Sequence, residues 1–199
     1  GLDRLDVLVF VLPEVAQVKD IEQTYPHRFD VWRHTLHVLD YVDAVVATLT
    51  GGSLPAGSPS FGDIPAAAWG ELVRRLGQFG EIIRNYLAAM ISAGRNRHLL
   101  LRLAALLHDV GKPRTWSRGD DGRIHFYGHE TRGGEEAVRR LRALRFSRSE
   151  VSRVGRMVAA HLRPAHLARE DRVTRRAVYR YFRDTGDVGV DTVLLSLAD

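Results

Sequence analysis

Residues 107–112 of the chain read Leu-His-Asp-Val-Gly-Lys, and they close the most apolar run of the sequence, residues 99–107. Arg102 is the one charged side chain in that run, so the pattern predicts a helix that is buried nearly all round. A carboxylate at the end of a buried helix is costly to remove from water unless a partner compensates for the lost hydration. A divalent cation is the strongest such partner, and we therefore interpret His108 and Asp109 as metal ligands.

Lys112 follows the pair after the turn that Val110 and Gly111 make, and Pro113 prevents the helix from continuing unchanged. The chain has two lysines against 27 arginines, so a compact ammonium at this position is unusual here and suits contact with one phosphate oxygen. The alternative interpretation is a buried helix that ends in a charged loop. In that case Lys112 would favour the carbonyl end of the helix dipole without any ligand.

Composition restricts both the class of protein and the kind of metal site. With 199 residues, of which 45% are hydrophobic, the chain can bury a sizeable core, and we expect residues 1–199 to form a single domain. The absence of cysteine excludes disulfides and thiolate ligands, so any metal must be held by histidine and carboxylate. No signal peptide and no apolar run of 18 residues is present, which predicts a cytoplasmic protein with no membrane partner. Gly1 in place of Met is typical of a tag remnant or of a part of a longer protein.

The positive charge of the chain is concentrated in its second half. The formal net charge is +5, yet residues 139–183 hold fourteen arginines against Glu150, Glu170 and Asp171. A segment this basic can face a polyanion such as RNA. The alternative is a set of solvated helix faces, and the sequence leaves both interpretations open.

His34 is a further candidate ligand on a different helix. Asp30 is a plausible N-cap for a helix that runs to about Leu49, and His34 borders the apolar stripe of this helix whereas His37 points away from it. A single histidine beside a core is more often a packed residue than a ligand. The separate His-Asp pair elsewhere in the chain favours the ligand interpretation.

Three more candidates lie at predicted helix ends. His129 precedes a helix over about 131–145, and an imidazole at that end can bind a metal or meet a phosphate held by free backbone amides. His161, like His108, closes a buried helix. Asp199 closes the apolar segment 188–199, although the alternative for this residue is a frayed chain end.

The remaining segments complete an all-α pattern with one hairpin. Residues 50–65 are predicted to be a flexible loop insertion and residues 66–92 one long helix with Gly77 and Gly80 as weak points. A hairpin is expected around Gly-Asp-Asp-Gly at 119–122, with His125 on its surface. The other expected elements are short helices within 1–22, a helix over 148–161 with a Ser147–Glu150 capping box, stopped by Pro164, and a helix over 172–184. The side chains expected to face inward from the long helix are Leu72, Val73, Leu76, Phe79, Ile82, Ile83, Tyr86, Leu87 and Met90.

These candidates in this order, on a helical chain, resemble the HD superfamily of metal-dependent phosphohydrolases, which is named for a His-Asp doublet. The similarity sharpens toward the HD domain of bacterial tRNA nucleotidyltransferases and poly(A) polymerases. The nucleotidyltransferase head of that family is absent from these 199 residues, so nothing here is expected to add nucleotides. The matching stretches are residues 12–14, Gln23 with His27, 30–32, His34 with Thr35, 106–113, 123–130 and 195–199.

The resemblance implies an all-α HD-domain bundle of about seven to nine helices with a small hairpin after the doublet. It implies one or two divalent ions per chain, which His and carboxylate ligands allow to be Mg, Mn, Fe, Co, Ni or Zn. His129 and His161 would complete a second metal site, with Asp109 bridging, or would contact substrate. The first site would be held by His34, His108, Asp109 and Asp199.

The function that the resemblance implies is metal-dependent hydrolysis of a phosphomonoester or phosphodiester on a nucleotide or an RNA end, including tRNA. Asp109, Lys112 and His129 are the expected catalytic residues, and Lys112, His27 and Arg28 the expected substrate contacts. The alternative is a tRNA- or nucleotide-binding helical module with a structural or vestigial metal site. Nothing in the sequence predicts the oligomeric state.

Overall fold

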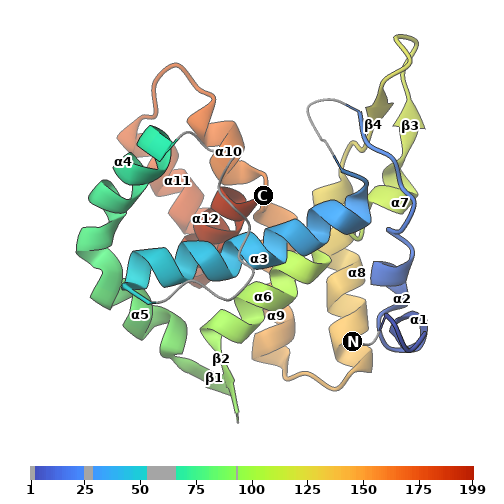
Figure 1. Cartoon of the computed structure of the whole chain (residues 1–199), viewed down its shortest axis with the longest axis horizontal. Helices are drawn as coiled ribbons and strands as arrows, with labels where there is room; N and C mark the ends of the chain where they lie inside the picture. Colours follow the sequence, from blue (N-terminus) through green and yellow to red (C-terminus); the bar gives the residue numbers. More distant parts are fainter. Residues whose placement is uncertain (1–2, 25–28, 53–65, 93) are drawn as a thin grey trace.

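A computed structural model describes residues 3–24, 29–52, 66–92 and 94–199, with the backbone alone for 66–69 (Figure 1). Helices dominate, and eight of the described helices have nine or more residues, as the sequence predicts. The helices are α1 (Leu8–Val11), α2 (Pro13–Ala16), α3 (Val31–Thr50), α4 (Ala66–Leu76), α5 (Gly80–Ala88), α6 (Arg97–Leu107), α7 (Lys112–Thr115), α8 (His129–Ala143), α9 (Arg148–Ala160), α10 (Arg163–Ala168), α11 (Arg175–Thr185) and α12 (Gly189–Ala198), with 3-10 turns η1 (Gly77–Phe79) and η2 (Gly186–Val188).

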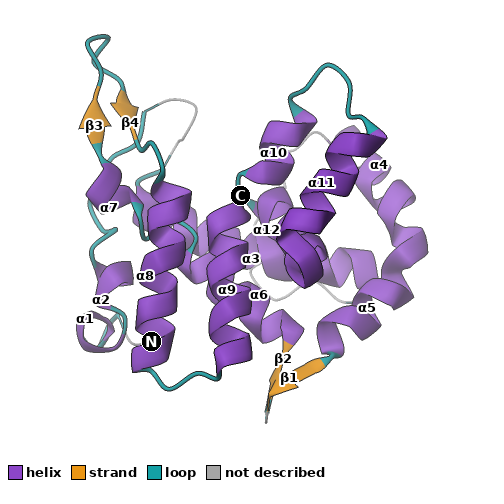
Figure 2. Cartoon of the chain, turned by 180° about the vertical axis from the view of Figure 1, so that it is seen from behind, coloured by secondary structure: helices purple, strands orange, loops and turns teal. Residues whose placement is uncertain are grey.

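Four short strands form two antiparallel ribbons, which lie at opposite ends of the molecule (Figure 2). Strand β1 (Met90–Ser92) pairs with β2 (Arg95–Asn96), and β3 (Ser117–Arg118) pairs with β4 (Ile124–His125). The β3–β4 ribbon is the predicted hairpin after the doublet, whereas the β1–β2 ribbon was not predicted.

Helix α6 is the centre of the core, as its apolar sequence predicts. It packs against α3 on one side and α9 on the other, while α12 contacts α3, α6 and α9 (Figure 1). Asn96 caps α6 by accepting a hydrogen bond from the Leu99 amide at 2.9 Å. The fully enclosed apolar side chains of α6 are Leu100, Leu101, Ala104, Ala105 and Leu107.

The predicted capping box at the start of α9 is present. Glu150 accepts from the Ser147 amide at 2.7 Å while the Ser147 hydroxyl accepts from the Glu150 amide at 3.3 Å. The buried Glu150 carboxylate also accepts from the Ser92 hydroxyl at 2.5 Å and from the Arg95 guanidinium. The β1–β2 ribbon is therefore anchored to the N-terminus of α9.

The single long helix predicted over residues 66–92 is wrong. The chain forms α4, the turn η1, α5 and then β1, and the change of direction falls at the predicted weak points. Gly80 abuts the end of α3 so closely that a Cβ on it would lie 2.3 Å from the Leu49 carbonyl oxygen, so packing selects glycine here. Three side chains expected to be inward, Phe79, Ile82 and Met90, are instead 46%, 66% and 61% exposed.

Two smaller differences concern prolines and caps near the end of the chain. Pro164 does not simply end α9 but lies in the first turn of α10, where the missing amide costs nothing. Helix α11 begins at Arg175 rather than 172, because the Thr174 hydroxyl accepts from the Ala177 amide and caps it.

Some predictions fall outside the described residues. His27 and Arg28 lie outside the described residues, and so do residues 53–65 of the predicted insertion 50–65. The described part of that insertion contains Thr50, where α3 ends, and Gly51, which caps α3 in a left-handed conformation. The assignment of residues 1–199 to one domain stays a prediction. Among the described helices, none combines the length and the apolar character needed to cross a bilayer.

Candidate metal centre

All six candidate ligands lie at or near helix ends, and the fold brings those ends together. Helices α6, α9 and α12 point their C-termini at a common region, which the N-termini of α3 and α8 approach from other directions (Figure 1). The residues are His34 in the first turn of α3, His108 and Asp109 after α6, His129 at the start of α8, His161 after α9 and Asp199 after α12.

Four of these side chains form one cluster. His34 Nε2 lies 2.9 Å from Asp199 Oδ1 and 3.3 Å from His108 Nε2. His108 Nε2 lies 3.2 Å from Asp109 Oδ2 and 3.5 Å from Asp199 Oδ1. His34 Nε2 lies 3.6 Å from Asp109 Oδ2, so each of the two histidines lies within 3.6 Å of both carboxylates, although His34 and Asp199 are 165 positions apart.

A second cluster shares Asp109 with the first. Asp109 Oδ1 lies 3.4 Å from His129 Nε2, and the His129 and His161 rings have centroids 5.3 Å apart. The donor atoms of Asp109, His129 and His161 lie within 4.8 Å of one another, as do those of His34, His108 and Asp109. Each group is compact enough to hold one metal ion, with the two oxygens of Asp109 facing different groups.

Three of the histidines are oriented by the same hydrogen bond. In each, Nδ1 lies 2.7 Å from the carbonyl oxygen three residues earlier, and because a carbonyl can only accept, Nδ1 carries the proton. Nε2 is thereby directed into the clusters, which is the arrangement that metal-binding histidines commonly use. The pairs are His108 with Ala105, His129 with Phe126, and His161 with Val158.

The buried centre contains two ionised carboxylates, Asp109 and Asp199, whose negative charge a cation would compensate. Burial lowers the pKa of His108, but the Asp109 and Asp199 carboxylates outweigh burial and raise that pKa to about 10. Burial raises the pKa values of Asp109 and Asp199, yet His108 and the other cations around them hold both well below the usual range. The protein without metal thus keeps a proton on His108 where a metal ion would supply the positive charge.

His161 behaves in the opposite way. Burial and the neighbouring charge on His108 lower the pKa of His161 to about 4, so its imidazole is neutral at pH 7. Its Nε2 is buried and has no hydrogen-bond partner among the described residues. An enclosed lone pair without a donor is costly, and it fits a metal ligand better than a packed core residue.

Lys112 lies beside the doublet, where the sequence predicts it. Its Nζ donates to Asp109 Oδ2 at 2.7 Å and to Gln23 Oε1 at 2.5 Å, and the side chain is buried. Gln23 was not predicted to have a role in the site. Since an ammonium has three protons, one remains for a group in the adjoining cavity.

A cavity of about 550 Å³ opens beside the metal centre. Asp109, Lys112, His129, His161 and Asp199 form its inner lining. The outer walls include Tyr127 after β4 and His166 on α10, which sequence reasoning missed, and His125 on β4, which we had interpreted as a surface residue only.

Two further histidines, His37 and His98, have partners away from the centre, in agreement with the sequence interpretation. His98 Nε2 lies 3.3 Å from Asp43 Oδ1. The His37 ring stacks on Phe29 with centroids 4.4 Å apart. Neither shares a metal cluster with the doublet.

Comparison with known proteins agrees with this geometry. An A-adding tRNA nucleotidyltransferase of Deinococcus radiodurans is 45% identical over 83 residues, which are 41% of this chain and 19% of that protein. A CC-adding tRNA nucleotidyltransferase of Thermus thermophilus is 41% identical over 99 residues, 49% of this chain and 21% of that protein. The matches thus span about a fifth of the length of these relatives. Residues 73–198, more than half of the chain, match the family model described as the HD domain, and the chain therefore belongs to the HD domain family.

Proposed function

We propose that the protein is a metal-dependent phosphohydrolase that cleaves a phosphomonoester or phosphodiester on a nucleotide or an RNA end. The observation that carries the proposal is the position of Asp109. One carboxylate oxygen faces His34 and His108, and the other faces His129, at the inner end of an open cavity. Membership of the HD family and the tRNA-directed names of the relatives support this choice of chemistry and substrate.

The residues present fit a divalent ion. His34, His108, Asp109 and Asp199 would hold it, and the donor set of imidazole and carboxylate accepts Mg, Mn, Fe, Co, Ni or Zn. Asp109, His129 and His161 would hold a second ion. The unpartnered Nε2 of His161 supports this second site, because it leaves a buried acceptor without any protein donor in the described part of the chain.

A bound divalent ion supplies a Lewis acid for the phosphate and a water of lowered pKa. The chain contributes the rest of the chemistry. Lys112, with two of its three protons already engaged, can donate the third to a phosphoryl oxygen and offset the negative charge that builds up there. His129 borders the cavity, and in the alternative in which no second ion occupies its Nε2, that nitrogen can take up a proton and pass it to the leaving oxygen. His27 and Arg28 remain predicted substrate contacts.

Hydrolysis after metal removal and replacement tests the proposal. The chelated protein would be reloaded with each of the six metals and assayed on nucleoside 2′-, 3′- and 5′-monophosphates and on 2′,3′-cyclic nucleotides. We expect turnover with at least one metal and loss of at least about 10³-fold in His108→Ala and Asp109→Asn. His37→Ala is the matched control, and it should retain the wild-type rate. Turnover that survives chelation or the His108 substitution would refute the proposal.

The number of ions can be measured separately. If both clusters bind, elemental analysis should give two ions per chain in the wild type and one in His161→Gln, which removes a ligand of the second cluster only. A wild-type stoichiometry of one, unchanged in His161→Gln, would assign His129 and His161 to substrate contact instead.

A second candidate function is tRNA or nucleotide binding with a structural or vestigial metal. Of the fourteen arginines in 139–183, eight form no ion pair within the described part of the chain, and four of these are exposed on α11 or just before it. These four are Arg172, Arg175, Arg176 and Arg180.

Salt dependence separates this candidate from the first. Binding through phosphate contacts weakens steeply as salt rises, and Arg176→Gln with Arg180→Gln should reduce that slope by about two. RNA affinity retained in His108→Ala, with no metal-dependent turnover in the wild type, would favour the binding module.

A further inference from the structure

An aromatic pair lines the outer wall of the cavity beside the metal centre. His125 is the last residue of β4 and Tyr127 lies in the turn that follows it, and their two rings stack on each other. Their rings are 5.0 Å apart between centroids and 10° from parallel. Tyr127 is 77% exposed, so most of its ring surface beyond His125 is open. We call these two rings the aromatic platform.

The aromatic platform and the metal centre border the same cavity. His125 and Tyr127 line it together with Asp109, Lys112 and His129. Gly128 has a left-handed φ of 76°, and this turn separates Tyr127 from His129 by a single residue. The volume of about 550 Å³ is within the range of small-molecule sites. A ligand with a phosphate at Asp109 and Lys112 can therefore extend an attached ring to Tyr127.

Among the described residues, the hydrogen bonds that stabilise the hairpin do not involve the exposed side chain of Tyr127. The hairpin is held by other groups, including the Thr24 hydroxyl, which donates to the Ile124 carbonyl at 3.3 Å, and the Gly119 amide, which donates to the Arg123 carbonyl at 2.8 Å. The Tyr127 hydroxyl makes no hydrogen bond with a described residue, and the side chain is not part of the apolar core. A large aromatic surface kept in water on a secured hairpin is available for a ligand.

We propose that the aromatic platform stacks the base of a nucleotide whose phosphate occupies the metal centre. The position of the phosphate rests on the proposed function, whereas base stacking rests on the two rings themselves. Nucleobases stack on tyrosine and histidine in single-stranded recognition with little dependence on sequence. Arg123 also lines the cavity, and its side chain is exposed enough to meet a neighbouring phosphate. The substrate class is therefore a nucleotide, or the unpaired terminal nucleotide of an RNA.

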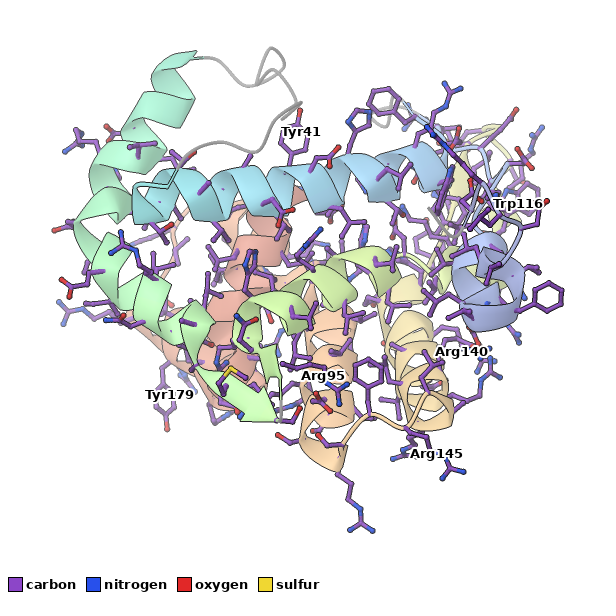
Figure 3. The ribbon with its side chains drawn as sticks, turned by 60° about the horizontal axis from the view of Figure 1, so that its bottom comes forward. Tyr41, Arg95, Trp116, Arg140, Arg145 and Tyr179 are labelled. Carbon is purple, nitrogen blue, oxygen red and sulfur yellow. The ribbon has the colours of Figure 1, made fainter. Side chains whose placement is uncertain are left out.

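Two other exposed aromatic residues provide controls. Tyr179 on α11 is 68% exposed and Trp116 is 47% exposed, and neither lines the cavity. Figure 3 shows these two side chains at opposite ends of the view, so they do not form one surface. Tyr179→Ala therefore removes an equally accessible ring at a different place.

Fluorescence of 2-aminopurine tests the stacking directly, because stacking quenches it. The nucleotide 2-aminopurine ribonucleoside 5′-monophosphate would be titrated with the full chain in the presence of Mn²⁺. We expect quenching with the wild type, about tenfold weaker binding with Tyr127→Ala or His125→Ala, and wild-type binding with Tyr127→Phe and Tyr179→Ala. Ribose 5-phosphate, which has no base, should compete equally well in the wild type and in Tyr127→Ala.

The outcomes separate this inference from the proposed function. Quenching that depends on Tyr127 in a protein without any hydrolytic activity would support the aromatic platform and refute only the hydrolase. Hydrolysis with the same KM in Tyr127→Ala as in the wild type, or unchanged affinity for the 2-aminopurine nucleotide, would refute the aromatic platform. A parallel titration with a short RNA ending in 2-aminopurine shows whether the terminal nucleotide of RNA binds more tightly than the free nucleotide.

Discussion

The ammonium of Lys112 lies 2.7 Å from Oδ2 of Asp109, the same carboxylate oxygen that lies 3.2 Å from Nε2 of His108. Both cations are buried, and both hold the pKa of Asp109 well below its usual range although burial alone would raise it. A lysine so placed keeps Asp109 ionised and adds positive charge at the wall of the cavity.

Replacing Lys112 by glutamine should lower kcat about 100-fold while the protein still binds metal. The variant removes a positive charge beside the phosphate but leaves every candidate ligand in place. Steady-state hydrolysis and elemental analysis of the same sample measure the two quantities. Breaking a buried ion pair also costs about 3 kcal/mol of stability, so circular dichroism must show that the variant is folded at the assay temperature. A wild-type kcat in the folded variant would remove Lys112 from the catalytic groups.

The stability of the chelated protein should fall as pH rises from about 6.5 to 10. The Asp109 and Asp199 carboxylates raise the pKa of folded His108 to about 10, above the value of about 6.5 for an unfolded chain. The proton on His108 therefore stabilises the fold fully below pH 6.5, and that contribution is lost as pH passes toward 10. Thermal unfolding at pH 7 and pH 9 in the presence of EDTA measures this loss.

A bound metal ion should abolish this decrease in stability at high pH. Binding must displace the His108 proton, so apparent metal affinity should increase about tenfold per pH unit below pH 10. The metal-loaded protein should then melt no lower at pH 9 than at pH 7. His108→Asn provides the control, because it removes the titrating group and should flatten the pH dependence of the chelated protein.

The doublet and its helix could be predicted from sequence because their signal is local. An apolar run that ends in His-Asp demands both burial and a compensating partner, and the structure shows His108 and Asp109 enclosed at the end of α6. By contrast, the prediction that His34 and Asp199 belong to one site depended on the family resemblance. These residues are 165 positions apart, and only the packing of α12 against α3 brings them within 2.9 Å.

The cavity wall was missed for a physical reason. Hairpin residues such as His125 and Tyr127 have no apolar periodicity that distinguishes a ligand-facing side from a solvent-facing side. Gln23 was missed because its contact with Lys112 crosses 89 residues. Gly80 was predicted as a weak point, but the break itself was not, since glycine there is required by the end of α3 and not by its own segment.

Glu150→Gln should destabilise the protein without changing kcat. The carboxylate belongs to the capping box of α9 and accepts from Ser92 and Arg95, so its loss should reduce the free energy of unfolding by about 2 kcal/mol. We expect kcat to stay unchanged because Glu150 and His161 lie near opposite ends of α9, about 17 Å apart along its axis.

At acidic pH, the wild type and Glu150→Gln should differ less in their free energy of unfolding. Burial raises the pKa of Glu150, but hydrogen bonds from Arg95 and Ser92 outweigh it and lower that pKa to about 2. The wild type therefore loses the contribution of this carboxylate as pH falls from 4.5 toward 2, whereas the glutamine variant has none to lose. Urea denaturation at pH 7 and pH 3 tests this, and an equal difference at both pH values would contradict it.

Gly111→Ala should damage the centre through packing alone. A Cβ on Gly111 would lie 2.1 Å from the His129 carbonyl oxygen and 2.7 Å from the Gly133 amide, so α8 would have to move away from the doublet. Because His129 begins α8, we expect a loss of about 3 kcal/mol of stability together with a lower kcat. Gly70→Ala is the matched control, because its Cβ would meet nothing within 4 Å in α4 and should be neutral or stabilising by up to about 1 kcal/mol. If Gly111→Ala were as stable and active as Gly70→Ala, the contact between the doublet and α8 would not position His129.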